Sequence, residues 1–109
     1  FANLPGGSEF ISNFSEALGR DPTTLDVVFF SCCNGAEMHI DKLPSKFFPI
    51  TYVIPVILPP NGKKVLFTEH CEMDIELFTI YEFDHEKPHG LHLEDTESGC
   101  VVLMIGVLK

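Results

Sequence analysis

Short apolar segments with a period of two residues dominate this chain, and they leave room for one short helix. The segments are 25–33, 36–40, 50–58, 65–68, 72–84 and 100–108. Turn-forming residues separate them at intervals of about eight to fourteen residues, which is typical of antiparallel β proteins. The sequence therefore predicts a mainly β fold, an antiparallel β-sandwich or small barrel of about seven strands with one short N-terminal helix. Because long helices do not alternate with the strands, a doubly wound parallel sheet is excluded.

The helix is predicted near the N-terminus, over residues 9–18. Its apolar side chains recur at helical spacing, and Gly19 is a residue that commonly ends helices. These side chains are Phe10, Ile11, Phe14, Ala17 and Leu18. A helix of about three turns is marginal in isolation, so we expect its apolar stripe to pack on a sheet.

The length of 109 residues corresponds to one domain. Residues 8–109 are predicted to form that single β-rich domain. Gly6, Gly7 and Ser8 resemble a flexible linker. Residues 1–7 are therefore expected to be a flexible N-terminal segment, or a peptide and linker introduced by cloning.

Two turn sequences predict β-hairpins. Asn34-Gly35 suits a type I′ turn between 25–33 and 36–40, and the Pro-Pro-Asn-Gly sequence at 59–62 suggests a second hairpin. In segment 36–40 the alternation predicts Ala36, Met38 and Ile40 on the core face. The same alternation places Glu37, His39 and Asp41 in solvent.

The sequences of two predicted apolar strands indicate where these strands lie in a sheet. Segment 50–58 contains Pro55, which predicts an edge strand or a β-bulge. Segment 100–108 is apolar on both faces, so it belongs in the centre of a sheet or in an interface. Neither segment exceeds about nine residues, roughly half the length of a membrane-spanning helix.

The charge of the chain disfavours binding to polyanions. The sequence has 16 acidic and 7 basic residues, a formal net charge of −9. Such a charge repels phosphate backbones and anionic bilayers. The composition therefore predicts that neither nucleic acid nor a membrane is a partner.

The acidic residues concentrate on one predicted strand face, where Glu72, Asp74 and Glu76 alternate with apolar residues. Like charges at this spacing repel one another unless a basic group neutralises them. This pattern predicts a partner-binding surface for a basic segment, with an ordinary solvated face as the alternative. Phe78 and Ile80 continue the same face, where they either contact the partner or lie under the N-terminal helix.

Three histidines lie close together at His85, His89 and His92, with carboxylates nearby. Imidazole and carboxylate groups suit divalent transition metals, so these histidines are candidate metal ligands. Their spacing matches no established metal motif, and Pro88 prevents a helix that would align them. A solvated loop is the alternative, and no cofactor is expected.

The cysteines at positions 32, 33, 71 and 100 predict reduced thiols in an intracellular, cytoplasmic or nuclear, protein. A secreted, disulfide-bonded domain is the alternative. The sequence carries neither a nucleophile elbow nor a glycine-rich phosphate loop, so no enzymatic activity is expected.

The function predicted from these features is a non-enzymatic protein-protein interaction or oligomerisation module. It would form a homo-oligomer and bind a short or basic segment of a protein partner. The alternative is a metal-binding protein or metal-dependent enzyme that uses the stretch from His85 to His92.

Overall fold

The computed structural model describes the backbone of residues 5–109 and the side chains of residues 5–26 and 34–109. Within that part of the chain there are one α-helix, one 3₁₀-helix and eight strands. The elements are α1 (Gly7–Leu18), η1 (Pro22–Thr24), β1 (Leu25–Cys33), β2 (Ala36–His39), β3 (Phe47–Ile57), β4 (Lys64–Thr68), β5 (Glu72–Asp74), β6 (Tyr81–Asp84), β7 (His89–Leu93) and β8 (Cys100–Leu108).

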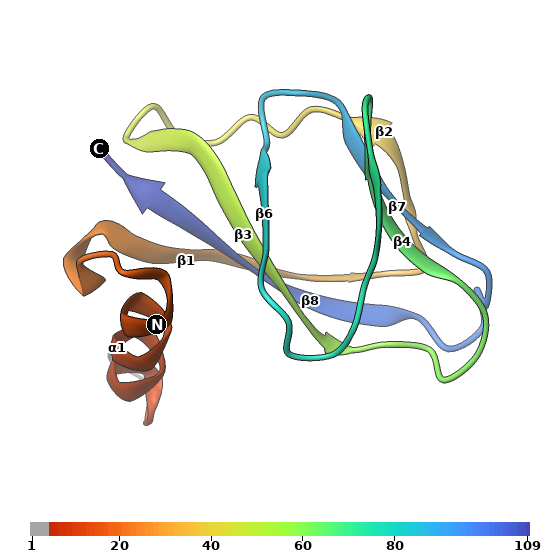
Figure 1. Cartoon of the computed structure of the whole chain (residues 1–109), viewed down its shortest axis with the longest axis horizontal. Helices are drawn as coiled ribbons and strands as arrows, with labels where there is room; N and C mark the ends of the chain where they lie inside the picture. The colour runs from red at the N-terminus through yellow and green to blue at the C-terminus, as the bar shows by residue number, and fades with distance from the viewer. Residues whose placement is uncertain (1–4) are drawn as a thin grey trace.

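The strands form two antiparallel four-stranded sheets, with strand orders β1-β8-β3-β6 and β2-β7-β4-β5 (Figure 1). Consecutive strands change sheet at every connection except the one between β4 and β5. This double-sheet arrangement of eight strands is a jelly roll, one of the antiparallel β-sandwich architectures. The predicted mainly β sandwich with an N-terminal helix is therefore confirmed, with eight strands in the described residues instead of about seven.

Strand β8 runs through the middle of the first sheet, where it pairs with both β1 and β3. Its two faces meet two different apolar layers. Leu103, Ile105 and Val107 belong to the core cluster that includes the helix, whereas Val102 and Met104 pack in the cluster between the sheets. The prediction that segment 100–108 is a central strand is confirmed, and its apolar character on both faces follows from this double burial.

Helix α1 covers the outer face of the first sheet (Figure 1). Ile11 and Phe14 are buried against this sheet, and the Phe14 ring meets the edge of Tyr52 at 5.8 Å between centroids. Burial of each such side chain stabilises the fold by about 1.5–3 kcal/mol. Gly19, with φ of +68°, ends the helix, as expected from the sequence.

Both predicted hairpins are wrong. Strands β1 and β2, on either side of Asn34-Gly35, belong to different sheets, and so do β3 and β4 on either side of residues 59–62. Gly35 does adopt a positive φ of +123°, but it turns the chain from one sheet to the other. Asn, Gly and Pro favour a turn of the backbone without determining which strand pairs next.

Strand β3 is not an edge strand, since it lies between β8 and β6. The alternative expectation for Pro55, a β-bulge, is confirmed by a register shift between Pro55 and Ile57. Strand β6 pairs with β3 only from Ile50 to Val53, so the missing N–H of Pro55 costs no bond on that side. The carbonyl of Pro55 instead accepts a hydrogen bond of 2.8 Å from the Phe78 N–H.

The alternating segment 72–84 is not one strand. It forms β5 and β6 in different sheets, and residues 75–80 connect them. Phe78 adopts a positive φ of 58° in this connection. Period-two alternation alone does not reveal such a break, because the residues on either side keep the same pattern.

Helix α1 begins at Gly7, within the segment predicted to be flexible, while residues 1–4 lie outside the described part of the chain. The division into a segment 1–7 and a domain 8–109 stays a prediction. Among the described residues, no helix is both long and apolar enough to cross a membrane.

The close packing of Gly90 in β7 yields a first prediction. A Cβ at this position would overlap the Phe67 ring and would lie 2.8 Å from the Ala36 carbonyl oxygen. We expect Gly90→Ala to lower the free energy of unfolding by about 1–3 kcal/mol, because such contacts force the strands apart. Urea unfolding followed by circular dichroism measures this change.

The control is His92→Ala at an exposed position of the same strand. It should change the free energy of unfolding by less than about 0.5 kcal/mol. Equal stabilities of Gly90→Ala and the parent chain would contradict the packing argument.

Candidate functional site

A β-bulge in β2 turns polar side chains into the sandwich. Ala36 pairs with Leu91 and His39 pairs with His89, so three steps along β2 match two steps along β7. One extra residue in β2 reverses the alternation that follows it. As a result His39 and Asp41 line a half-open cavity between the sheets, while Met38 and Ile40 are about half exposed, at 49% and 53%.

This arrangement corrects the predicted inward and outward faces of segment 36–40. Ala36 lines the cavity as expected, but beyond the bulge the polar residues face inward and the apolar ones outward. The sequence pattern did not show the extra residue, because a bulge arises from the pairing with another strand.

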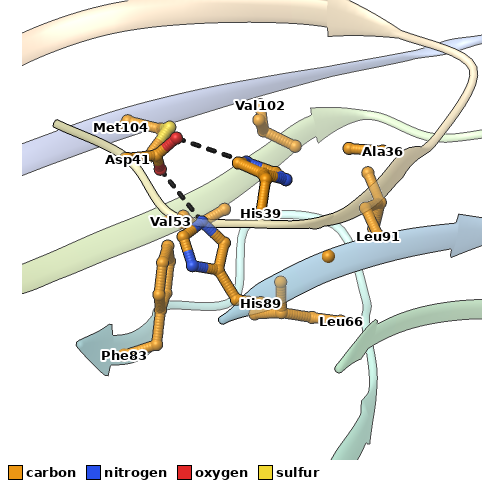
Figure 2. Close-up of a pocket in the computed structure, with 11 residues that line it drawn as sticks. Ala36, His39, Asp41, Val53, Leu66, Phe83, His89, Leu91, Val102 and Met104 are labelled. Atoms are coloured by element: carbon orange, nitrogen blue, oxygen red, sulfur yellow. Dashed lines mark hydrogen bonds and ion pairs between the residues drawn. The ribbon is translucent and has the colours of Figure 1, made fainter. Parts of the chain in front are cut away.

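The cavity lies between the two sheets and has a volume of about 210 Å³ (Figure 2). Three of its lining side chains are polar, and the rest of the wall is apolar or backbone. The lining residues are Ala36, His39, Asp41, Val53, Leu66, Phe83, His89, Gly90, Leu91, Val102 and Met104.

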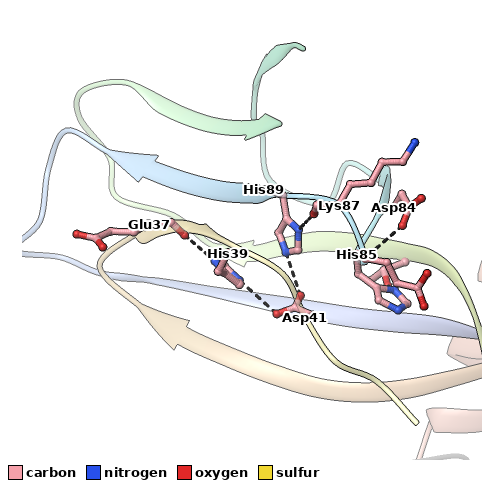
Figure 3. Close-up of polar contacts among 9 residues, drawn as sticks. Glu37, His39, Asp41, Asp84, His85, Lys87 and His89 are labelled. Atoms are coloured by element: carbon pink, nitrogen blue, oxygen red, sulfur yellow. Dashed lines mark hydrogen bonds and ion pairs between the residues drawn. The ribbon is translucent and has the colours of Figure 1, made fainter. Parts of the chain in front are cut away.

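The three polar side chains converge on one another. Asp41 lies between the two imidazoles, with Oδ2 3.0 Å from His89 Nε2 and Oδ1 3.2 Å from His39 Nε2 (Figures 2 and 3). The imidazole rings lie 4.6 Å apart between centroids. The His89 side chain is 5% exposed and that of His39 is 43% exposed, so the cluster extends from the interior to the surface.

Backbone carbonyls fix the orientation of both imidazoles. His39 Nδ1 lies 2.6 Å from the carbonyl oxygen of Glu37, and His89 Nδ1 lies 2.9 Å from that of Lys87 (Figure 3). A carbonyl only accepts hydrogen bonds, so the proton of each bond belongs to Nδ1. In a neutral imidazole of this tautomer, Nε2 carries a lone pair, and here both Nε2 atoms point at the carboxylate.

A lone pair that faces a carboxylate oxygen is favourable when a proton or a cation lies between them. One ligand atom from each of the three residues lies within 4.8 Å of the others. Histidine ligands commonly donate their second ring N–H to a backbone carbonyl, as both do here. Two imidazoles and one carboxylate form a ligand set for divalent transition ions that leaves coordination positions open.

His85 occupies a separate, structural position. Its side chain is 2% exposed, and its Nδ1 shares a hydrogen bond of 2.5 Å with Oγ1 of the fully buried Thr51. The backbone of His85 joins two segments, since its N–H donates to the Pro49 carbonyl and its carbonyl accepts from the Asp41 N–H, both at 3.0 Å. His85 thus holds the Asp41 backbone beside β3 without joining the cluster.

The three histidines predicted as metal ligands therefore separate in space. His89 joins the cluster, whereas His85 bonds to Thr51 and His92 is exposed on β7. The structure does not bring these three histidines into one cluster, and a metal-binding role for the stretch from His85 to His92 stays a prediction. The sequence analysis missed His39 and Asp41, although a histidine and a carboxylate two residues apart on a strand share one face and were a usable signal.

The predicted partner-binding residues fall in several environments. Glu72 and Asp74 are exposed on β5, and Glu76 is exposed in the following connection. Phe78 is 72% exposed and is not covered by the helix, whereas Ile80 packs against the core cluster that includes α1. Both alternatives for Ile80, helix cover and partner contact, stay predictions, as does a binding role for the other residues.

Of the cysteines with described side chains, Cys71 is exposed and Cys100 is buried. The side chains of Cys32 and Cys33 lie outside the described residues. The expectation of reduced thiols stays a prediction.

Comparisons with known proteins give one similarity, in the fold. No protein-family model and no curated protein matches the sequence. Among solved structures, the chain is similar to an HTH_3 family transcriptional regulator from Vibrio cholerae, with a TM-score of 0.50 and 14% sequence identity. The match covers 94% of this chain and 64% of that chain, so this chain spans less than two thirds of the regulator's length. At this identity the similarity shows a shared fold.

This finding corrects two predictions. The structural neighbour is a transcriptional regulator, which contradicts the interpretation as a protein-protein interaction module and the exclusion of nucleic acid as a partner. The net charge of −9 bears only on phosphate contacts that the residues of this chain would make.

The buried bond between Thr51 and His85 yields a second prediction. We expect Thr51→Val to lower the free energy of unfolding by about 1–3 kcal/mol, because it leaves a buried imidazole nitrogen without its partner. Chemical denaturation measures the change. Thr96→Val, at an exposed position, is the matched control and should change stability by less than about 0.5 kcal/mol. A Thr51→Val chain as stable as the control would show that this bond contributes nothing.

Proposed function

We propose that this jelly-roll domain binds a divalent transition metal ion through His39, Asp41 and His89 and serves as the ligand-responsive part of a transcriptional regulator. The observation that carries the proposal is the convergence of two Nε2 atoms on one carboxylate, with each Nδ1 bonded to a carbonyl. That arrangement orients three metal ligands before any ion arrives.

The surroundings of the cluster support the same function. His89 is held between the Phe83 ring, at 4.5 Å between centroids, and the His39 ring. Asp41 is held through its N–H by the His85 carbonyl. Ligands held in this way lose little side-chain entropy when they bind an ion, which favours affinity.

The regulatory part of the proposal is supported by the structural neighbour. That protein is a transcriptional regulator, and the part of its chain outside the match is more than a third of its length. We propose that the present chain belongs to a regulator of this kind, with nucleic acid as a partner of the whole protein. The domain itself would bind a ligand without converting it, and the location would be intracellular, where DNA and reduced thiols are found.

Metal titration yields a third prediction. After treatment with EDTA and removal of the chelator, the chain should bind one Co²⁺ or Zn²⁺ per molecule in isothermal titration calorimetry. Asp41→Asn and His89→Gln should each weaken binding by about 100-fold or more, because each removes one of three ligands. A bound ion should also raise the melting temperature, since it binds the folded state alone.

His92→Gln is the matched control for His89→Gln, because both replace a histidine of β7 by the same residue. Its metal affinity should equal that of the parent chain, since His92 is exposed and outside the cluster. Absence of binding by the parent chain would overturn the proposal. Equal losses in the His92 and His89 variants would place the metal elsewhere.

A further inference from the structure

We infer that the ligand sensed at this site is a small monocarboxylate with a compact apolar body, an inference that rests on the proposed metal site. Its carboxylate would occupy the open coordination positions of the ion. Its apolar body would fill the cavity that extends from the cluster between the sheets (Figure 2).

Charge determines the head of this ligand. A divalent ion held by one carboxylate and two neutral imidazoles keeps a net positive charge. Among the described residues of the wall, Asp41 is the one that carries a negative charge. An uncompensated charge at the edge of an apolar cavity is unfavourable, and an anionic ligand neutralises it. Carboxylate oxygens are also suitable donors for the ions that this ligand set favours.

The wall determines the body of the ligand. Beyond the cluster, the cavity is bounded by Val53, Leu66, Phe83, Val102 and Met104, whose side chains offer no strong hydrogen-bonding group. A second charged or hydroxyl group on the ligand would lose its water there without gaining a partner. The wall therefore selects an aliphatic body and disfavours dicarboxylates and sugars.

The volume determines the size of the ligand. A cavity of about 210 Å³ holds the volume of about seven liquid water molecules. A ligand of about seven non-hydrogen atoms corresponds to that space, and butanoate, with six, is within it. The His39 side chain is 43% exposed, so the cluster reaches the surface at this imidazole.

The test uses the Co²⁺-loaded chain, whose visible absorption reports on the ligands of the ion, with butanoate as the probe. Butanoate should change the spectrum saturably, and butan-1-ol, which has no anionic head, should leave it unchanged. Succinate should bind at least tenfold more weakly than butanoate, because its second carboxylate would face the apolar wall.

A filled cavity provides the matched variant. Ala36→Leu adds carbon atoms to the cavity wall, so it should keep the Co²⁺ spectrum and weaken butanoate binding by at least tenfold. Thr96→Leu introduces the same residue at an exposed position outside the cavity wall and should leave both properties unchanged.

The outcomes separate the two proposals. A chain that acquires no Co²⁺ spectrum overturns the proposed metal site, and the inference with it. A Co²⁺ spectrum that butanoate does not change overturns the inference and leaves the metal site standing. Equal affinities for acetate, butanoate and succinate, or full butanoate affinity in Ala36→Leu, would show that the cavity takes no part in binding.

Discussion

The antiparallel pairing of β8 with β1 and β3 is the constraint on which the rest of the molecule depends. It places one strand at the centre of a sheet whose two faces are both covered, by α1 on one side and by the second sheet on the other. Ile105 and Val107 are almost fully buried as a result. The second sheet packs against Val102 and Met104, which also form part of the cavity wall, so the same strand that builds the core shapes the site.

Several elements follow from the sequence because their patterns depend on short-range geometry. The stripe that contains Ile11 and Phe14 identifies the helix, and Gly19 identifies its end. The composition of segment 100–108 identifies a central strand. The sequence did not predict that the chain crosses from one sheet to the other at Asn34-Gly35 and at 59–62. Whether a turn forms a hairpin or leads to the other sheet depends on pairing with residues far along the chain.

The candidate site was harder to predict because it depends on pairing as well. Only the register of β2 against β7 shows that His39 and Asp41 face inward and that His39 lies opposite His89. Of the predicted ligands, His89 alone belongs to the cluster. The clustering of histidines along the chain was misleading. Residues adjacent in sequence on a strand point to opposite faces of the sheet, whereas residues opposite each other on paired strands point to the same face.

The register of the cluster also affects the order in which the molecule opens. Asp41 and His89 are separated by 48 residues along the chain, and the segments that carry them meet only when the second sheet has closed. Contacts of such long range form slowly, because most of the chain must be ordered first. An ion bound by both segments would therefore connect two parts of the chain that come together late in folding. Such an ion would slow unfolding more than it speeds folding. Its release from the protein would mark the step at which β2 separates from β7.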